Sequence, residues 1–194
     1  GGTNEQTKLR DFLKNDFKKV VELNNIFKNS LTYLNKKSYS NTHAWTSYRI
    51  AAAYQAANDL PNALAYYKRA VELAPYQLDM INKYATALSM SGNIKDAKYY
   101  YEQILSEYPK HVSALTNLGF IYLSNERNTD KAASYYEKAL ALNPDYEPAL
   151  LNKAGLYLYL GKNMEAKQIL EKILKLNPQN AQAKQVLQQL KTST

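Results

Sequence analysis

The chain has 194 residues, no cysteine, and 25 Lys and Arg against 17 Asp and Glu, so its formal net charge is +8. No apolar run approaches the length of a membrane span and no secretory signal is present. The excess charge is spread along the chain, which favours solvated helix faces over a nucleic-acid-binding arm. Without cysteine the compartment is not defined, and both the cytoplasm and the periplasm are compatible with this composition.

Residues 1–43 form an N-terminal helical segment in our interpretation. It is either one helix or two helices broken near Asn24-Asn25, and the second option makes it a degenerate hairpin that caps the chain. The alternative is a helix that binds a partner or a second copy. The chain begins Gly1-Gly2 without methionine, so we expect a trimmed or processed chain. The apolar residues that follow a helical period are Leu9, Leu13, Phe17, Val20, Val21, Phe27, Leu31 and Leu34.

A period near 34 residues dominates the rest of the chain. Pro75, Pro109, Pro144 and Pro178 are spaced 34, 35 and 34 residues apart. Such a period indicates stacked helical hairpins, with each proline ending the second helix of its unit. The third unit is one residue longer, and we place the extra residue in the polar turn 125–128. The four units are Ala44–Gln77, Leu78–His111, Val112–Tyr146 and Glu147–Asn180.

Within each unit, small and large residues recur in fixed columns. Small residues let two helices approach closely, and a large residue fills the space between hairpins. Gly92 and Gly161 stand where the first helix of a unit is expected to end. We therefore predict two helices of about 12 to 14 residues per unit. The small columns are Ala51, Ala85, Gly119 and Ala154, and Ala63, Ala97, Ala132 and Ala166; the large column is Tyr67, Tyr101, Tyr136 and Leu170.

These columns resemble the tetratricopeptide repeat, and the third unit matches it best, through Leu118-Gly119, Tyr122, Ala132, Tyr136 and Pro144. The resemblance covers residues 44–180. It implies an all-α superhelix, an α-solenoid of stacked antiparallel helix pairs with end helices. Two positions depart from the pattern, since Ser47 and Lys153 replace apolar residues and leave the packing of those turns open.

Residues 181–194 are predicted to be a capping helix and tail. Ala183, Val186, Leu187 and Leu190 share one face of this helix. A repeat array needs such a cap because its last unit otherwise exposes an apolar face.

The resemblance also implies a binding groove lined by the first helices. The residues at the sixth position of each unit would form a ladder, with amides to grip a peptide backbone and positive charge for acidic groups. We give peptide contact here the same weight as an ordinary solvated surface. The sixth-position residues are Arg49, Lys83, Asn117 and Asn152, and the other groove candidates are Trp45, Tyr48, Asn82, Thr86, Phe120, Leu123 and Tyr159.

The sequence contains no recognisable catalytic motif. His43 and His111 fall at predicted loop positions without a partner at ligand spacing, so we expect no metal, no cofactor and no enzyme. The 18 tyrosines are expected to fill core and boundary positions. Base stacking would need basic residues on an open groove, but Lys68, Lys98 and Lys138 are expected on the convex side, so no nucleic-acid partner is expected.

We interpret the chain as a non-catalytic scaffold that binds a protein or peptide segment in its groove. One alternative is a self-assembly module, a homo-oligomer formed through the end helices. Another is a regulatory or targeting domain trimmed from a larger enzyme or a membrane-associated protein. The sequence does not identify the partner.

Overall fold

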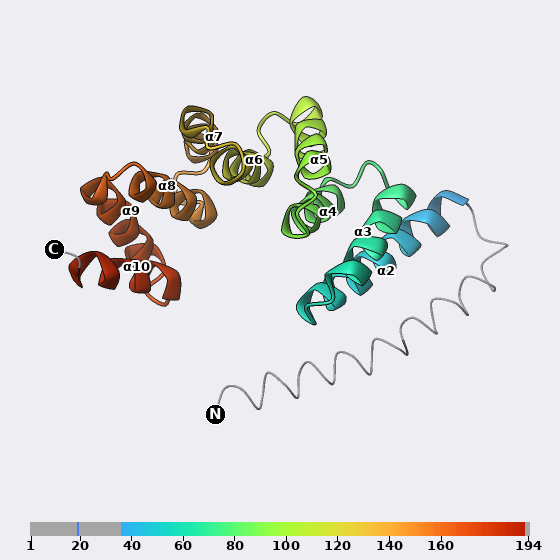
Figure 1. The fold of residues 1–194 in the computed structure, drawn as a ribbon. Coiled ribbons are helices and arrows are strands. Elements are labelled where there is room, and N and C mark those ends of the chain that lie inside the picture. Colours follow the sequence, from blue (N-terminus) through green and yellow to red (C-terminus); the bar gives the residue numbers. More distant parts are fainter. Residues whose placement is uncertain (1–18, 20–35, 193–194) are drawn as a thin grey trace. The chain divides into compact units, whose positions relative to one another are not determined.

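The computed structural model describes Lys19 and residues 36–192 of the chain (Figure 1). Within the continuous stretch from 36 to 192, every regular element is an α-helix. The helices are α2 (Lys36–Ala56), α3 (Leu60–Leu73), α4 (Leu78–Met90), α5 (Ile94–Glu107), α6 (Val112–Ser124), α7 (Thr129–Leu142), α8 (Glu147–Tyr159), α9 (Asn163–Leu176) and α10 (Ala181–Thr192).

The helices belong to two units, residues 1–100 and 101–194, whose boundary lies inside α5. In the first unit α3 packs against both α2 and α4. In the second unit α6 packs against α7, α7 against α8, α8 against α9, and α9 against α10. Consecutive helices therefore stack on one another within each unit, and the prediction of an all-α solenoid of helix pairs is confirmed.

Helix lengths follow the predicted pattern except at the start. The helices from α3 to α9 contain 13 or 14 residues each. In contrast, α2 has 21 residues and begins at Lys36, so it continues through the boundary predicted at residue 43. The structure places His43 inside this helix with its side chain buried, so the prediction that His43 lies in a loop is wrong. The predicted break near residues 24 and 25 lies outside the described residues.

The turn inside each pair reverses the chain with one left-handed residue. These residues are Asn58, Gly92, Arg127 and Gly161, with φ of 58°, 84°, 54° and 72°. Glycine adopts this conformation without steric cost, which explains its two occurrences as helix ends and confirms both predictions. The turn between α6 and α7 spans residues 125–128, and the other three turns have three residues each, so it contains the extra residue. All four period-setting prolines lie in the turns that follow second helices.

The predicted core columns are buried. The alanines of the predicted column in the second helices are fully buried, and each lies one helical turn before a large buried residue; they are Ala63, Ala97, Ala132 and Ala166. The large residues Tyr67, Tyr101, Tyr136 and Leu170 are at most 1% exposed. Burial raises the pKa of Tyr67 to about 12, and the neighbouring Tyr48 makes a smaller contribution in the same direction. Burial also raises the pKa of Tyr136. One tyrosine per cluster thus fills the core, as predicted.

The two departures from the pattern are accommodated differently. Ser47 is fully buried, and its hydroxyl has no hydrogen-bond partner among the described residues. Lys153 is half-buried and lies against an aromatic ring, with Nζ 5.7 Å from the ring centroid of Tyr157. A lysine stem can cover apolar surface in this way while its ammonium group stays in water.

The C-terminal helix α10 covers the last pair. Ala183 is buried in a cluster with Leu150 and Leu170, and Val186, Leu187 and Leu190 pack against the same cluster. Asn180 caps the N-terminus of α10, because its Oδ1 accepts a hydrogen bond from the Ala183 backbone N–H at 2.7 Å.

Candidate interaction surface

The eleven residues proposed for the groove lie on the first helices of the four pairs. We define the first-unit face as Trp45, Tyr48 and Arg49 of α2 with Asn82 and Lys83 of α4. We define the second-unit face as Asn117, Phe120 and Leu123 of α6 with Asn152 and Tyr159 of α8.

On the first-unit face, three aromatic rings contact one another in sequence, from an exposed tryptophan to a buried tyrosine. The ring of Trp45 meets that of Tyr48 edge-on, with centroids 5.5 Å apart, and Tyr48 in turn meets the buried Tyr67 at 5.8 Å. The Tyr67 hydroxyl donates a hydrogen bond to Oε1 of Gln55 at 2.8 Å. These contacts hold Trp45 in one position while leaving it exposed, which reduces the ordering cost of binding a partner.

The charged groups of this face are mostly positive. Arg49 and Lys83 are exposed, and neither forms an ion pair with a carboxylate of the described residues. Burial raises the pKa of Tyr48, and the negative charge of Asp79 raises it further. Asn82 is half-buried, and its backbone carbonyl accepts a hydrogen bond from the Thr86 hydroxyl at 2.8 Å. The two exposed cations can therefore meet acidic groups of a ligand.

The second-unit face is more apolar. Phe120 and Tyr159 are exposed, whereas Leu123 and the two asparagines are half-buried. The helices α6 and α8, which carry these residues, contact each other directly. Large apolar side chains exposed on one side of a helix pair often mark a surface that binds other molecules.

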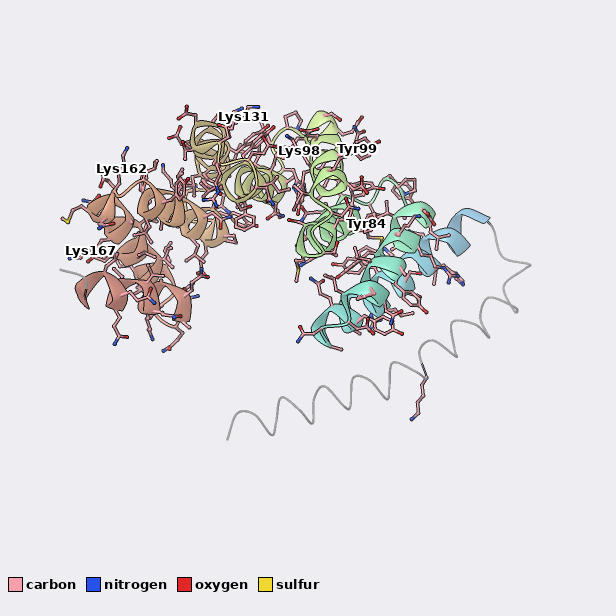
Figure 2. All side chains as sticks on the ribbon, in the orientation of Figure 1. Tyr84, Lys98, Tyr99, Lys131, Lys162 and Lys167 are labelled. Atoms are coloured by element: carbon pink, nitrogen blue, oxygen red, sulfur yellow. The ribbon has the colours of Figure 1, made fainter. Side chains whose placement is uncertain are left out.

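Cations lie beside the tyrosines of α8. The Arg127 guanidinium, from the long turn after α6, is 5.8 Å from the ring centroid of Tyr159. Lys153 and Lys162 each place Nζ 5.7 Å from the centroid of Tyr157, and Lys162 lies in the turn before α9 (Figure 2). Cation–π contacts at exposed sites contribute only about 0.5–1 kcal/mol each, so these cations remain available to an anionic partner.

Two further exposed residues, one in each unit, were not identified as interaction candidates from the sequence. Met90, at the end of α4, is exposed and accepts a hydrogen bond from Nε2 of Gln55 at 3.3 Å. Arg127 reaches α8 from the one turn that is longer than the others. A methionine at the last position of a first helix, and a basic residue in an extended turn, are the signals that could have identified them.

Other aromatic groups do not belong to either face. Tyr122 and Tyr135 stack with their planes 9° apart, and Lys131 and Lys138 lie over their rings. Lys131 stands at the start of α7 and Tyr99 on α5, both on second helices (Figure 2). Lysines of the second helix α7 thus lie over one tyrosine of the first helix α6 and one tyrosine of α7 itself.

The described residues contain no group of three or more His, Asp or Glu side chains arranged to hold a metal ion. His111 is the N-cap of α6, where Nδ1 accepts a hydrogen bond from the Ala114 backbone N–H at 3.1 Å. None of the helices in the described part of the chain is both long enough and apolar enough to cross a bilayer.

Three family models, each described as tetratricopeptide repeat, match residues 46–77, 85–147 and 125–190. Together these matches include more than half of the chain. No curated protein matches the chain in sequence.

Several solved structures share the fold. A thermophilic TPR protein of Thermus thermophilus is 21% identical with a TM-score of 0.70, over 77% of this chain and 82% of that one. PilW, a type IV pilus biogenesis factor, is 23% identical with a TM-score of 0.68, over 77% and 69%. YrrB, described as a TPR protein with an unusual peptide-binding site, is 18% identical with a TM-score of 0.61, over 93% and 89%. At these identities the similarity concerns the fold alone.

Proposed function

We propose, since the chain belongs to the tetratricopeptide-repeat family, that it is a non-catalytic scaffold that binds a segment of a partner protein. The partner lies against the first helices, on the first-unit face, the second-unit face or both. The partner is held by apolar side chains, while amides and cations contact its backbone and its acidic groups. Rigid helix pairs preorganise the surface, so little of the binding free energy is lost in ordering it.

One observation carries this proposal. Each first helix has a single exposed large apolar side chain among the described residues: Trp45 on α2 (40% exposed), Met90 on α4 (61%), Phe120 on α6 (46%) and Tyr159 on α8 (52%). Exposing four such side chains on corresponding helices is unfavourable for an isolated chain in water. A partner that covers them would gain their burial free energy, at about 25 cal/mol per Å² of apolar surface.

The sixth-position residues support the same proposal. Arg49 and Lys83 are exposed, and Asn117 and Asn152 are half-buried, so all four keep polar atoms near the surface of a first helix. An asparagine amide can both donate to a peptide carbonyl and accept from a peptide N–H. YrrB, which is described as having a peptide-binding site and shares this fold, agrees with a peptide ligand.

The test is a pull-down from a lysate of the source organism with three baits. The first is the wild-type chain, and the second carries Arg49→Glu, Asn117→Ala and Asn152→Ala. The third is a matched control with the same types of change on exposed positions of second helices, Lys95→Glu, Gln103→Ala and Gln168→Ala. Circular dichroism confirms that all three are folded.

We expect one protein to be captured by the wild type and by the control, and to be lost by the first-helix variant. Equal capture by all three baits would contradict the proposal and move the interaction to another surface. Sedimentation of the wild type over a range of concentrations completes the test, because a stable homo-oligomer that the first-helix variant leaves intact would favour self-assembly instead.

A further inference from the structure

Gly155 is a glycine in the interior of α8 that nothing in the described structure requires. It is exposed, its φ is not positive, and a Cβ atom built on it meets no atom within 4 Å. By contrast, a Cβ atom on Gly119 would lie 2.7 Å from Cε1 of Tyr136, so packing explains that glycine. Glycine is the least favourable residue in a helix interior after proline, so Gly155 weakens α8 without a return in packing or backbone geometry.

The neighbours of Gly155 on the helix surface belong to the second-unit face. Asn152 precedes it by three residues and Tyr159 follows it by four, and this spacing places all three on one side of the helix. Tyr159 is half exposed, and Arg127 lies over its ring at 5.8 Å. The missing side chain therefore leaves helix backbone open to solvent between the Asn152 amide on one side and the Tyr159 ring with its cation on the other. We call these three residues the Gly155 notch.

We propose that the Gly155 notch seats a bulky apolar side chain of an acidic, extended peptide segment of the partner. This inference rests on the proposed function and assigns a ligand chemistry to one part of the surface. A glycine lets a ligand approach the helix backbone more closely than any other residue does. The seated side chain packs against the Tyr159 ring, the Asn152 amide pairs with the peptide backbone, and Arg127 receives a carboxylate of the peptide.

The charges around α8 favour an acidic occupant. Arg127 lies over the ring of Tyr159 and does not pair with a carboxylate of the described residues. Lys153 and Lys162 lie over Tyr157, which is two residues from Gly155 and therefore on another side of α8, so Arg127 is the cation assigned to the Gly155 notch. The carboxylate that α8 itself carries, Glu147, is occupied by amide groups. A second copy of the chain is a less suitable occupant, because two molecules of net charge +8 repel each other.

The experiment uses the full chain and a phage-displayed library of random short peptides as the probe. The tightest enriched peptide is synthesised with a fluorescein label, and its affinity is measured by anisotropy for the wild type, Gly155→Ala, Gly155→Leu and Arg127→Glu. Ala141→Leu is the matched control, because it introduces the same leucine side chain at an exposed position of α7 in the same unit. Gly155→Ala favours the helix, so a loss of binding by this variant does not reflect unfolding.

We expect enriched peptides to combine Asp or Glu with a large apolar residue. Gly155→Leu should weaken binding by about tenfold or more, Gly155→Ala by a smaller factor, and Arg127→Glu by about tenfold, while Ala141→Leu binds as the wild type does. Peptides that bind the Gly155 variants as tightly as the wild type, or that lack acidic residues, would overturn this inference and leave the proposed function standing.

Two further outcomes are decisive. A library that yields no enriched peptide would count against the proposed function and this inference together. Self-association of the wild type that Gly155→Leu abolishes would assign the notch to a second copy and overturn the peptide assignment.

Discussion

The Cβ position of Gly119 lies 2.7 Å from Cε1 and 3.0 Å from Cδ1 of Tyr136, so α6 and α7 are in contact through a glycine and a tyrosine ring. Tyr136 is fully buried and cannot move aside easily. The other three pairs have alanine in this column, at Ala51, Ala85 and Ala154. The third pair is thus packed more closely at this point than an alanine would allow.

The first prediction follows from this contact. Gly119→Ala should lower the free energy of unfolding by about 1–3 kcal/mol, because overpacking outweighs the gain in helix propensity. Gly155→Ala is the matched control, and it should raise the same free energy by about 1 kcal/mol because its Cβ meets nothing. Urea unfolding monitored by circular dichroism measures both. Equal effects of the two substitutions would show that α6 does not approach Tyr136 this closely.

The second prediction compares two buried tyrosine hydroxyls. The Tyr67 hydroxyl donates to Gln55, whereas the Tyr136 hydroxyl has no partner among the described residues. Tyr67→Phe should therefore destabilise the fold by about 1 kcal/mol. Tyr136→Phe should be neutral or stabilising, because it removes a buried hydroxyl that forms no hydrogen bond. Unfolding midpoints of the two variants give the answer, and a larger loss for Tyr136→Phe would reverse this assignment.

The third prediction concerns alkaline pH. Tyrosine ionises near pH 10 in an unfolded chain, and burial raises the pKa of Tyr67 to about 12. The folded state therefore disfavours the tyrosinate, and the corresponding stability is complete below pH 10 and is lost as the pH rises from 10 to 12. Tyr136, whose pKa is also raised by burial, acts in the same direction.

Urea midpoints measured across this pH range should fall, and the fall should be smaller in a Tyr67→Phe variant. A free energy of unfolding that is independent of pH above 10 would show that the tyrosine hydroxyls are accessible to water in the native state.

The fourth prediction concerns the connection between α8 and α10. Asn180 donates to Oε1 of Glu147 at 2.7 Å and caps α10 through the Ala183 backbone N–H. Asn180→Ala should therefore cost about 1–2 kcal/mol and increase amide exchange throughout α10. Asn177→Ala is the control, since Asn177 also donates to Glu147, at 3.1 Å, but does not cap α10. Unchanged exchange in α10 of the Asn180 variant would contradict a capping role.

The repeat architecture could be predicted from sequence because its determinants are local. A proline ends a helix and a glycine accepts a left-handed turn wherever they occur, so the period of Pro75 to Pro178 and the positions of Gly92 and Gly161 defined the helix pairs. Alternation of small and large residues at helical spacing likewise identified Ala132 and Tyr136 as core. These features depend on neighbours within one or two turns.

The burial of single side chains depended on contacts between helices, and the sequence alone does not show which residues form those contacts. His43 seemed to precede a helix, but α2 begins at Lys36, and the structure buries that histidine and Ser47. Gly119 and Gly155 look alike in sequence, and only the presence of Tyr136 beside one, and open space beside the other, separates a packing role from a proposed binding notch.

The sequence by itself thus determined the family, the period and the core columns, because these arise from backbone geometry and helical spacing. Tertiary packing alone decided which apolar side chains stay exposed on the first helices, such as Met90 and Tyr159, and which cations lie beside them, such as Arg127. The exposure of a side chain depends on which atoms of other helices reach it, and that arrangement exists only in the folded chain.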